Sequence, residues 1–213
     1  MASYRGHLLF ASALGAGYGA LGVWQLSFGR GPALLAAGLT AVAGLLPDLD
    51  SASGVPQRVT SGLLGVVAPL LLLRLLIRDN APLDETIVLV LLAYVVIRYG
   101  LSRLFKQLTV HRGMFHSLPA MFIAGLAVFL LDHGSELAVR LYLAGGVMLG
   151  FLSHLVLDEL CSVDFMGMHL KKSAGSALKL ASKSWGATLT CYALLAALGY
   201  LTWRDLTATT GPP

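Results

Sequence analysis

Residues 8–28 have the sequence LLFASALGAGYGALGVWQLSF, which contains no charged side chain. A helix that crosses a membrane needs about 20 predominantly apolar residues. The stretch is too long for the apolar region of a secretory signal peptide, and further apolar segments follow it along the chain. It therefore predicts the first membrane-spanning helix of an integral membrane protein.

The composition of the whole chain supports the same class of protein. The 213 residues are 56% hydrophobic and 12% charged, whereas soluble domains are about 45–50% apolar and roughly 25% charged. So little charge excludes a soluble enzyme and a disordered tail. Two cysteines far apart, Cys161 and Cys191, predict no disulfide framework. We expect one membrane-embedded helical domain over residues 1–206, followed by a frayed C-terminal tail over 207–213.

Further apolar segments divide the remaining chain into helices. They cover residues 32–46, 61–77, 86–101, 114–131, 137–157 and 185–203. Together with 8–28 they predict an all-α, polytopic helical bundle with about seven spans. The second segment is short and ends at Pro47, so it predicts either a tilted spanning helix or a re-entrant one.

The basic residues predict the orientation of these spans. If the N-terminus is cytoplasmic, ten basic residues lie on the cytoplasmic side: Arg5, Arg58, Arg98, Arg103, Lys106, Arg112, Lys171, Lys172, Lys179 and Lys183. Five lie on or near the outer side: Arg30, Arg74, Arg78, Arg140 and Arg204. Cytoplasmic loops carry an excess of Lys and Arg. We therefore expect a protein of a prokaryotic inner or cell membrane, with a cytoplasmic N-terminus, an outer C-terminus and no nucleic-acid partner.

Histidine and acidic residues gather at predicted helix ends. They occur at His7, in Pro47-Asp48-Leu49-Asp50, in His111-Arg112-Gly113-Met114-Phe115-His116-Ser117, and in Ser153-His154-Leu155-Val156-Leu157-Asp158-Glu159. With the orientation above, all four places lie at cytoplasmic ends. Ionisable groups at or in a membrane are costly to bury and usually functional. The convergence predicts one functional site.

Residue types and spacing at this site favour a divalent metal. His154 and Asp158 are four apart, so they are neighbours on one helix face, and His111 and His116 would bracket a helix start. Imidazole and carboxylate ligands suit zinc first, with manganese or iron as alternatives. The predicted ligands of one or two ions are His7, Asp48, His111, His116, His154 and Asp158. Taken alone, the His154–Asp158 pair fits an ion pair equally well, and Asp48 with Asp50 fits a capped turn.

These motifs resemble those of a known membrane family. His7, Pro47-Asp48-x-Asp50, His111-Arg112-Gly113-x-x-His116-Ser117 and Ser153-His154-x-x-x-Asp158 are similar to the marks of the YdjM-type family, described as LexA-regulated, membrane-bound, predicted metal-dependent hydrolases. The resemblance covers about residues 7–160. It implies a metal-dependent hydrolase. The order of the motifs is also similar, more faintly, to that of zinc-dependent phospholipase C.

We therefore expect an enzyme of lipid metabolism that hydrolyses a lipid or lipid-linked substrate, first of all at a phosphoester. Asp50 is the candidate for orienting or deprotonating water, and Arg112 is the candidate for holding a phosphate. The alternative is a transporter of a metal ion or proton that uses the same ligands. A third possibility is a metal that only joins helices. Oligomeric state and substrate stay open.

Overall fold

The computed structural model describes residues 3–50, 54–101, 114–161, 163–164, 169–170, 179–182 and 184–210. In these ranges the chain forms seven α-helices: α1 (Tyr4–Trp24), α2 (Arg30–Ala43), α3 (Gly54–Arg78), α4 (Leu83–Val95), α6 (Leu118–Leu131), α7 (Leu137–Leu160) and α8 (Trp185–Thr210). A 3₁₀ helix, η1 (Leu46–Asp50), follows α2, and a π-helical segment, η2 (Val96–Leu101), continues α4. The two-residue strands β1 (Val163–Asp164) and β2 (His169–Leu170) form a short antiparallel pair.

The predicted all-α membrane fold is confirmed, and each of the seven predicted segments overlaps one helix. Within the described ranges, five helices are long and apolar enough to cross a membrane: Tyr4–Trp24, Arg30–Asp48, Val59–Arg78, Leu137–Leu160 and Trp185–Ala208. Helix α6 is apolar but shorter. The short second segment gains length from η1 and becomes a 19-residue helical stretch.

Local sequence sets where the helices begin. The Ser3 hydroxyl accepts a hydrogen bond from the Gly6 amide at the start of α1, and Ser117 does the same for Ala120 at the start of α6. Both are the side-chain caps that helix N-termini favour. At the other end of the chain, α8 continues to Thr210 and so extends into the expected tail, while residues 211–213 lie outside the described residues.

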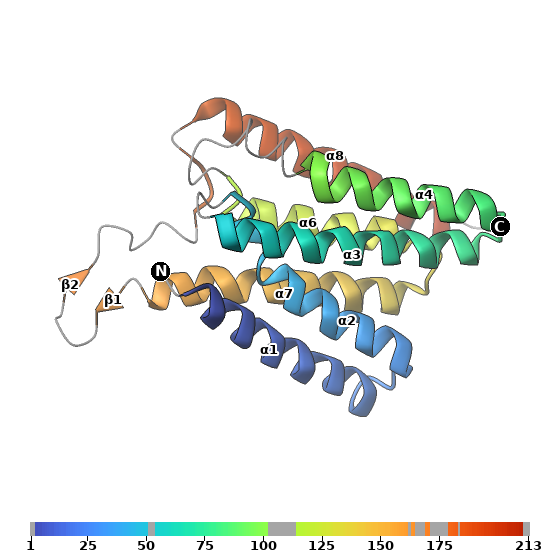
Figure 1. The fold of residues 1–213 in the computed structure, drawn as a ribbon, viewed down its shortest axis with the longest axis horizontal. Helices are drawn as coiled ribbons and strands as arrows, with labels where there is room; N and C mark the ends of the chain where they lie inside the picture. Colours follow the sequence, from blue (N-terminus) through green and yellow to red (C-terminus); the bar gives the residue numbers. More distant parts are fainter. Residues whose placement is uncertain are drawn as a thin grey trace.

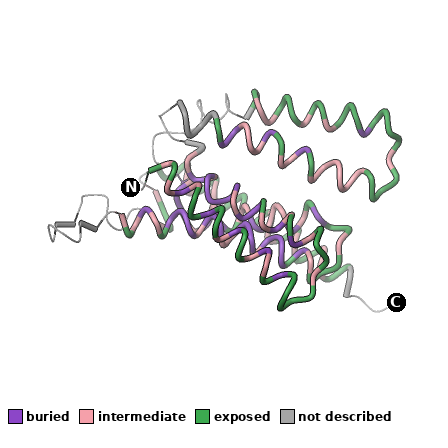
Figure 2. The backbone as a smooth tube through the Cα atoms, turned by 60° about the horizontal axis from the view of Figure 1, so that its bottom comes forward, coloured by how far each residue is buried: buried purple, intermediate pink, exposed green. Residues whose placement is uncertain are grey.

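The helices are arranged so that α7 is in the centre of the bundle (Figure 1). Helix α7 packs against α1, α2 and α6, helix α8 packs on α6, and α3 pairs with α4. Buried residues are concentrated in α2 and α7, whereas α4 and α8 are largely exposed (Figure 2). The two termini lie at opposite ends of the bundle (Figure 1).

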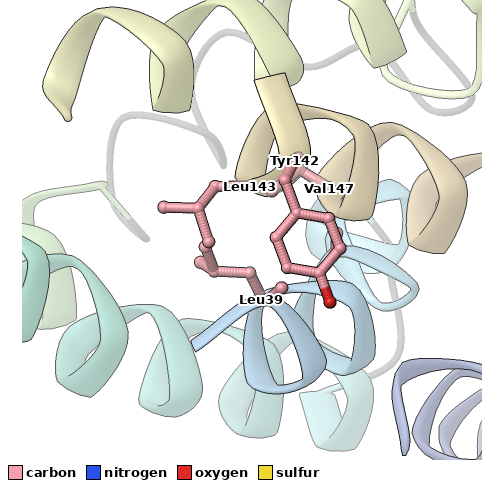
Figure 3. Packing of buried hydrophobic residues seen from close by; sticks show 6 residues of the cluster. Leu39, Tyr142, Leu143 and Val147 are labelled. Atoms are coloured by element: carbon pink, nitrogen blue, oxygen red, sulfur yellow. The ribbon is translucent and has the colours of Figure 1, made fainter. Parts of the chain in front are cut away.

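The core between α2 and α7 fixes how these helices lie against each other. Tyr142, Leu143 and Val147 of α7 pack against Leu39 of α2 (Figure 3). In addition, the hydroxyl of Tyr18 in α1 donates to the carbonyl of Tyr142, at 2.9 Å. The Tyr142 hydroxyl donates back to the carbonyl of Tyr18, at 2.7 Å. This reciprocal pair holds the later half of α1 and the start of α7 in one register.

Small residues let the helices approach closely. A Cβ added at Gly150 of α7 would collide with the backbone carbonyl of Thr40 in α2. A Cβ added at Gly44, the C-cap residue of α2, would collide with the Cβ of Ala11 in α1. Such contacts are typical of helix packing in membranes. They bring the ends of α1, α2 and α7 together at one end of the bundle.

Candidate metal centre

The close-packed end of the bundle carries five of the six predicted metal ligands. His7 lies in the first turns of α1, Asp48 lies in η1, and His116 lies in the turn just before α6. His154 and Asp158 lie in the last two turns of α7. Asp48 is partly buried, and the other four side chains are buried. Residues far apart in the chain thus form one cluster.

His154 is the residue common to all parts of the cluster. Its Nδ1 lies 2.7 Å from the backbone carbonyl of Gly44, so Nδ1 carries the proton and donates to that oxygen. The lone pair is therefore on Nε2. This atom lies 3.8 Å from Asp48 Oδ1 and 3.8 Å from Asp158 Oδ2. A backbone carbonyl that orients an imidazole in this way is the usual support of a metal-binding histidine.

His7 completes one side of the cluster. Its Nε2 lies 3.1 Å from Asp158 Oδ1, and its ring is stacked on that of His154 with 3.7 Å between the centroids. The His116 ring meets the His154 ring edge-on, with 5.5 Å between the centroids. Three imidazole rings therefore lie against one another, and the two carboxylates approach them from η1 and from α7.

The donor atoms form two overlapping sets that could each hold a metal ion. One set is His7, His154 and Asp158, and the other is Asp48, His116 and His154, with the atoms of each set within 4.8 Å of one another. Because Nδ1 of His154 is engaged by Gly44, only its Nε2 remains for a metal, and the two sets share that atom. The structure is therefore compatible with one ion among five donors, or with two ions of which one uses His154.

The residues fit a divalent cation. Among the described residues, His154 Nε2 and His7 Nδ1 are buried without a hydrogen-bond partner. Buried polar atoms nearly always have a partner in a folded protein. Nitrogen and carboxylate donors of this kind are those that zinc, manganese and iron accept. A bound metal would give these ring nitrogens a partner, and it would explain why two carboxylates lie close to them.

The local sequence explains how Asp48 reaches the cluster. Helix α2 ends at Ala43 with Gly44 as its C-cap, and the Asp48 amide then donates to the carbonyl of Leu45, so the chain forms a 3₁₀ turn. A turn at Asp48 agrees with the turn that the sequence of this segment fits. It directs Asp48 back toward α7.

Other predicted site residues fall outside what the structure describes. These are His111, Arg112 and the side chain of Asp50, whose backbone forms the last residue of η1. His116 precedes the capping Ser117 and so lies before α6, whereas the apolar run had predicted a helix from residue 114. The apolar run begins already in the turn before α6, because Met114 in that turn is buried.

Sequence reasoning missed Gly44. Gly44 acts through its backbone carbonyl, which accepts the hydrogen bond from His154. Every residue has such a carbonyl, so the residue type cannot predict this role. The available signal was a glycine close before Pro47-Asp48. At that position a larger side chain would separate α2 from α1, and the carbonyl would no longer reach His154.

A groove lies between the start of α1 and the end of α7, the two helix ends that also carry His7 and Asp158. It encloses about 560 Å³ and is lined by Ser3, Gly6, Leu9, Phe10, Leu157 and Cys161. Gly6 precedes His7, and Leu157 precedes Asp158. The groove is mostly apolar, and its lining residues Gly6 and Leu157 are sequence neighbours of the buried His7–Asp158 pair.

Comparison with known proteins identifies a family. The model of the YdjM inner membrane protein family matches residues 1–171, which include the whole cluster. No curated protein and no solved structure matches the chain. With most of its length matched, the chain belongs to the YdjM inner membrane protein family.

Proposed function

We propose that this membrane protein is a metal-dependent hydrolase that acts on a lipid or lipid-linked substrate, at a phosphoester. The observation that carries the proposal is the buried cluster of His7, Asp48, His116, His154 and Asp158 at one end of the bundle. With a cytoplasmic N-terminus, that end faces the cytoplasm of a prokaryotic cell. A site at the membrane surface would act on membrane lipids, and we expect no nucleic-acid partner.

A divalent metal, zinc by preference, would polarise the phosphoryl group and lower the pKa of a water molecule toward about 7 when bound. His154, Asp158, Asp48, His116 and His7 would hold it, together with His111 in the proposed ligand set. His7 holds Asp158 through one carboxylate oxygen, which leaves the other oxygen directed toward His154. The protein's own contribution is therefore a preoriented donor set in a buried setting.

Two further roles are proposed for the residues beside the cluster. Asp50 is two residues after Asp48 on the same 3₁₀ turn, and we assign it the orientation or deprotonation of water. Arg112 follows His111 directly in the sequence, and we assign it the binding of the phosphate, because a guanidinium can contact two phosphate oxygens at once.

The groove supports a lipid rather than a water-soluble substrate. Leu9 and Phe10 are exposed on a helix that is apolar along its length, so the groove opens toward the acyl chains of the bilayer. A lipid could therefore place its chain in the groove and its headgroup ester beside Asp158 without leaving the membrane. A transporter would instead need its ligands near the bilayer midplane, whereas these lie in the end turns of their helices.

The test is the metal content of detergent-purified protein, measured by elemental mass spectrometry. We expect stoichiometric zinc, manganese or iron in the wild type, and none in His154→Ala or Asp158→Ala. His133→Ala is the matched control, because His133 is exposed at the opposite end of the bundle and should leave the metal in place.

Activity is then followed by ³¹P NMR on phospholipids in mixed micelles. The wild type is expected to release a phosphorus-containing product, and both metal-free variants to be inactive. Absence of metal in the wild type, even after reconstitution, would exclude the hydrolase. Full activity in both variants would show that the site assignment is wrong.

A further inference from the structure

A second pocket lies at the end of the bundle opposite the metal centre. It encloses about 370 Å³ and is formed by three segments: the turn between α1 and α2, the last turns of α3, and the start of α7. The lining residues that matter for its chemistry are Gly29, Arg74, Arg78, Ser135 and Glu136. This pocket shares no residue with the cluster of His7 and His154.

Two arginines converge on one hydroxyl in this pocket. Arg74 Nη2 and Arg78 Nη1 each donate to Ser135 Oγ, both at 3.1 Å. Arg74 also lies 3.7 Å from Asp132 Oδ1. Among the described residues, Arg78 has no carboxylate within ion-pair distance. A neutral hydroxyl satisfies only one donor of each guanidinium, so most of their five N–H groups remain available.

The backbone around Arg78 is adapted to its position. A Cβ added at Gly134 would lie 2.6 Å from Arg78 Cδ and 3.0 Å from its Nη1. The missing side chain at Gly134 leaves room for the arginine in its observed position across the turn before α7, and a larger residue would displace it. The guanidinium reaches Ser135 at the rim of the pocket, and the Arg78 side chain is exposed.

The helix ends that border the pocket add to its positive potential. Helix α2 begins after Gly29 and α7 begins after Glu136, and neither cap makes a side-chain hydrogen bond to the first turn. Amide N–H groups at such ends favour anions. Glu136 opposes this effect, because its carboxylate also lines the pocket. The lining side chains still carry two positive charges against one negative charge.

We propose that this pocket binds a phosphate group, carried by a phospholipid headgroup or present as free phosphate. Two guanidiniums around a concave surface provide the paired donors that phosphate oxygens accept. The pocket lies at the ends of membrane helices, which is the level at which lipid headgroups are found. The proposal is independent of the metal centre and of the hydrolase function.

The experiment uses the full chain in a neutral detergent and measures binding by isothermal titration calorimetry. Two probes are titrated separately: dihexanoyl phosphatidylglycerol and inorganic phosphate. Saturable binding of both probes means that the phosphate alone is recognised. Saturable binding of the lipid alone means that its glycerol or acyl part is also needed. Either result supports the site if the variants below respond as expected.

Three variants and a control separate a phosphate site from a purely structural arginine pair. Arg78→Gln should weaken binding by about tenfold or more, since a charge-assisted hydrogen bond is lost. Gly134→Ala should weaken it without changing the net charge. Glu136→Gln should strengthen binding, a gain that misfolding cannot produce. Arg204→Gln removes the same charge from α8, outside the pocket, and should have no effect.

Two results would overturn the proposal. One is the absence of saturable binding of either probe to the wild type and to Glu136→Gln. The other is equal affinity in the wild type, Arg78→Gln and Glu136→Gln. If Arg78→Gln does not fold, as judged by its thermal unfolding, the response of Glu136→Gln alone decides the matter.

Discussion

At the scale of single residues, the two ring nitrogens of His154 have different roles. Nδ1 is used by the Gly44 carbonyl, and Nε2 faces Asp48 and Asp158. The orientation of the ring is therefore set before any ligand arrives. Such preorientation lowers the cost of forming a metal site, because no rotamer has to be selected on binding.

His7 offers a test of this arrangement. In His7→Phe the aromatic ring can still stack on His154, but the hydrogen bond to Asp158 is lost. Removing a neighbour that orients a ligand typically lowers metal affinity by about 10- to 100-fold, and loss of a direct ligand would lower it further. We expect a decrease of at least that size in a chelator competition titration. His133→Phe is the control, and an unchanged affinity in His7→Phe would contradict a role for His7.

Much of the site could be predicted at this scale. The spacing of His154 and Asp158 on a helix requires them to be neighbours, and the structure has them on one face. The contact between His7 and Asp158 could be predicted only because both residues were expected at the cytoplasmic ends of their helices. The stacking of His7 on His154 could not be predicted, because it depends on the register that Tyr18 and Tyr142 impose on α1 and α7.

At the scale of the elements, long apolar runs determined the helices but not their ends. Helix α3 begins at Gly54, well before the apolar run at residue 61, because a helix can continue with polar residues beyond the membrane. Helix α6 begins at Leu118 rather than at 114, because Ser117 caps it. A hydropathy pattern shows which residues are apolar enough to be buried in the membrane. It does not show which residue caps a helix, or whether a helix continues into the interface.

The groove between α1 and α7 gives a prediction for these two elements. Leu9→Trp places a large ring in the groove beside the metal cluster. We expect a raised KM for a long-chain phospholipid, with metal content unchanged. Leu21→Trp is the control, since it puts the same ring on an exposed position of α1 away from the groove. Equal kinetics for the two variants would mean that the substrate does not enter by this groove.

At the scale of the whole molecule, the two candidate sites lie at opposite ends of the helical bundle. The candidate metal centre is at the end where α1 begins and α7 finishes, and the arginine pocket is at the other end. The two sites are thus separated by the length of a spanning helix. In a bilayer, they would face different leaflets.

Reporter fusions test this orientation. With seven crossings and a cytoplasmic N-terminus, alkaline phosphatase fused after Pro213 should be active outside the cytoplasm, and a fluorescent protein fused there should be dark. Fusions after Asn80, in the turn between α3 and α4, should give the same pair of results. A fluorescent C-terminal fusion would contradict seven crossings from a cytoplasmic N-terminus, and the topology would be wrong.

The pairing of His7 with Asp158 also has a consequence for biosynthesis. His7 enters the bilayer soon after translation starts, whereas Asp158 leaves the ribosome only after α1, α2, α3, α4 and α6 have been made. The centre therefore closes late, when α7 inserts beside α1. A nascent chain that stalls before α7 lacks both His154 and Asp158, so the full donor set exists only once α7 has been made, with α8 still to follow.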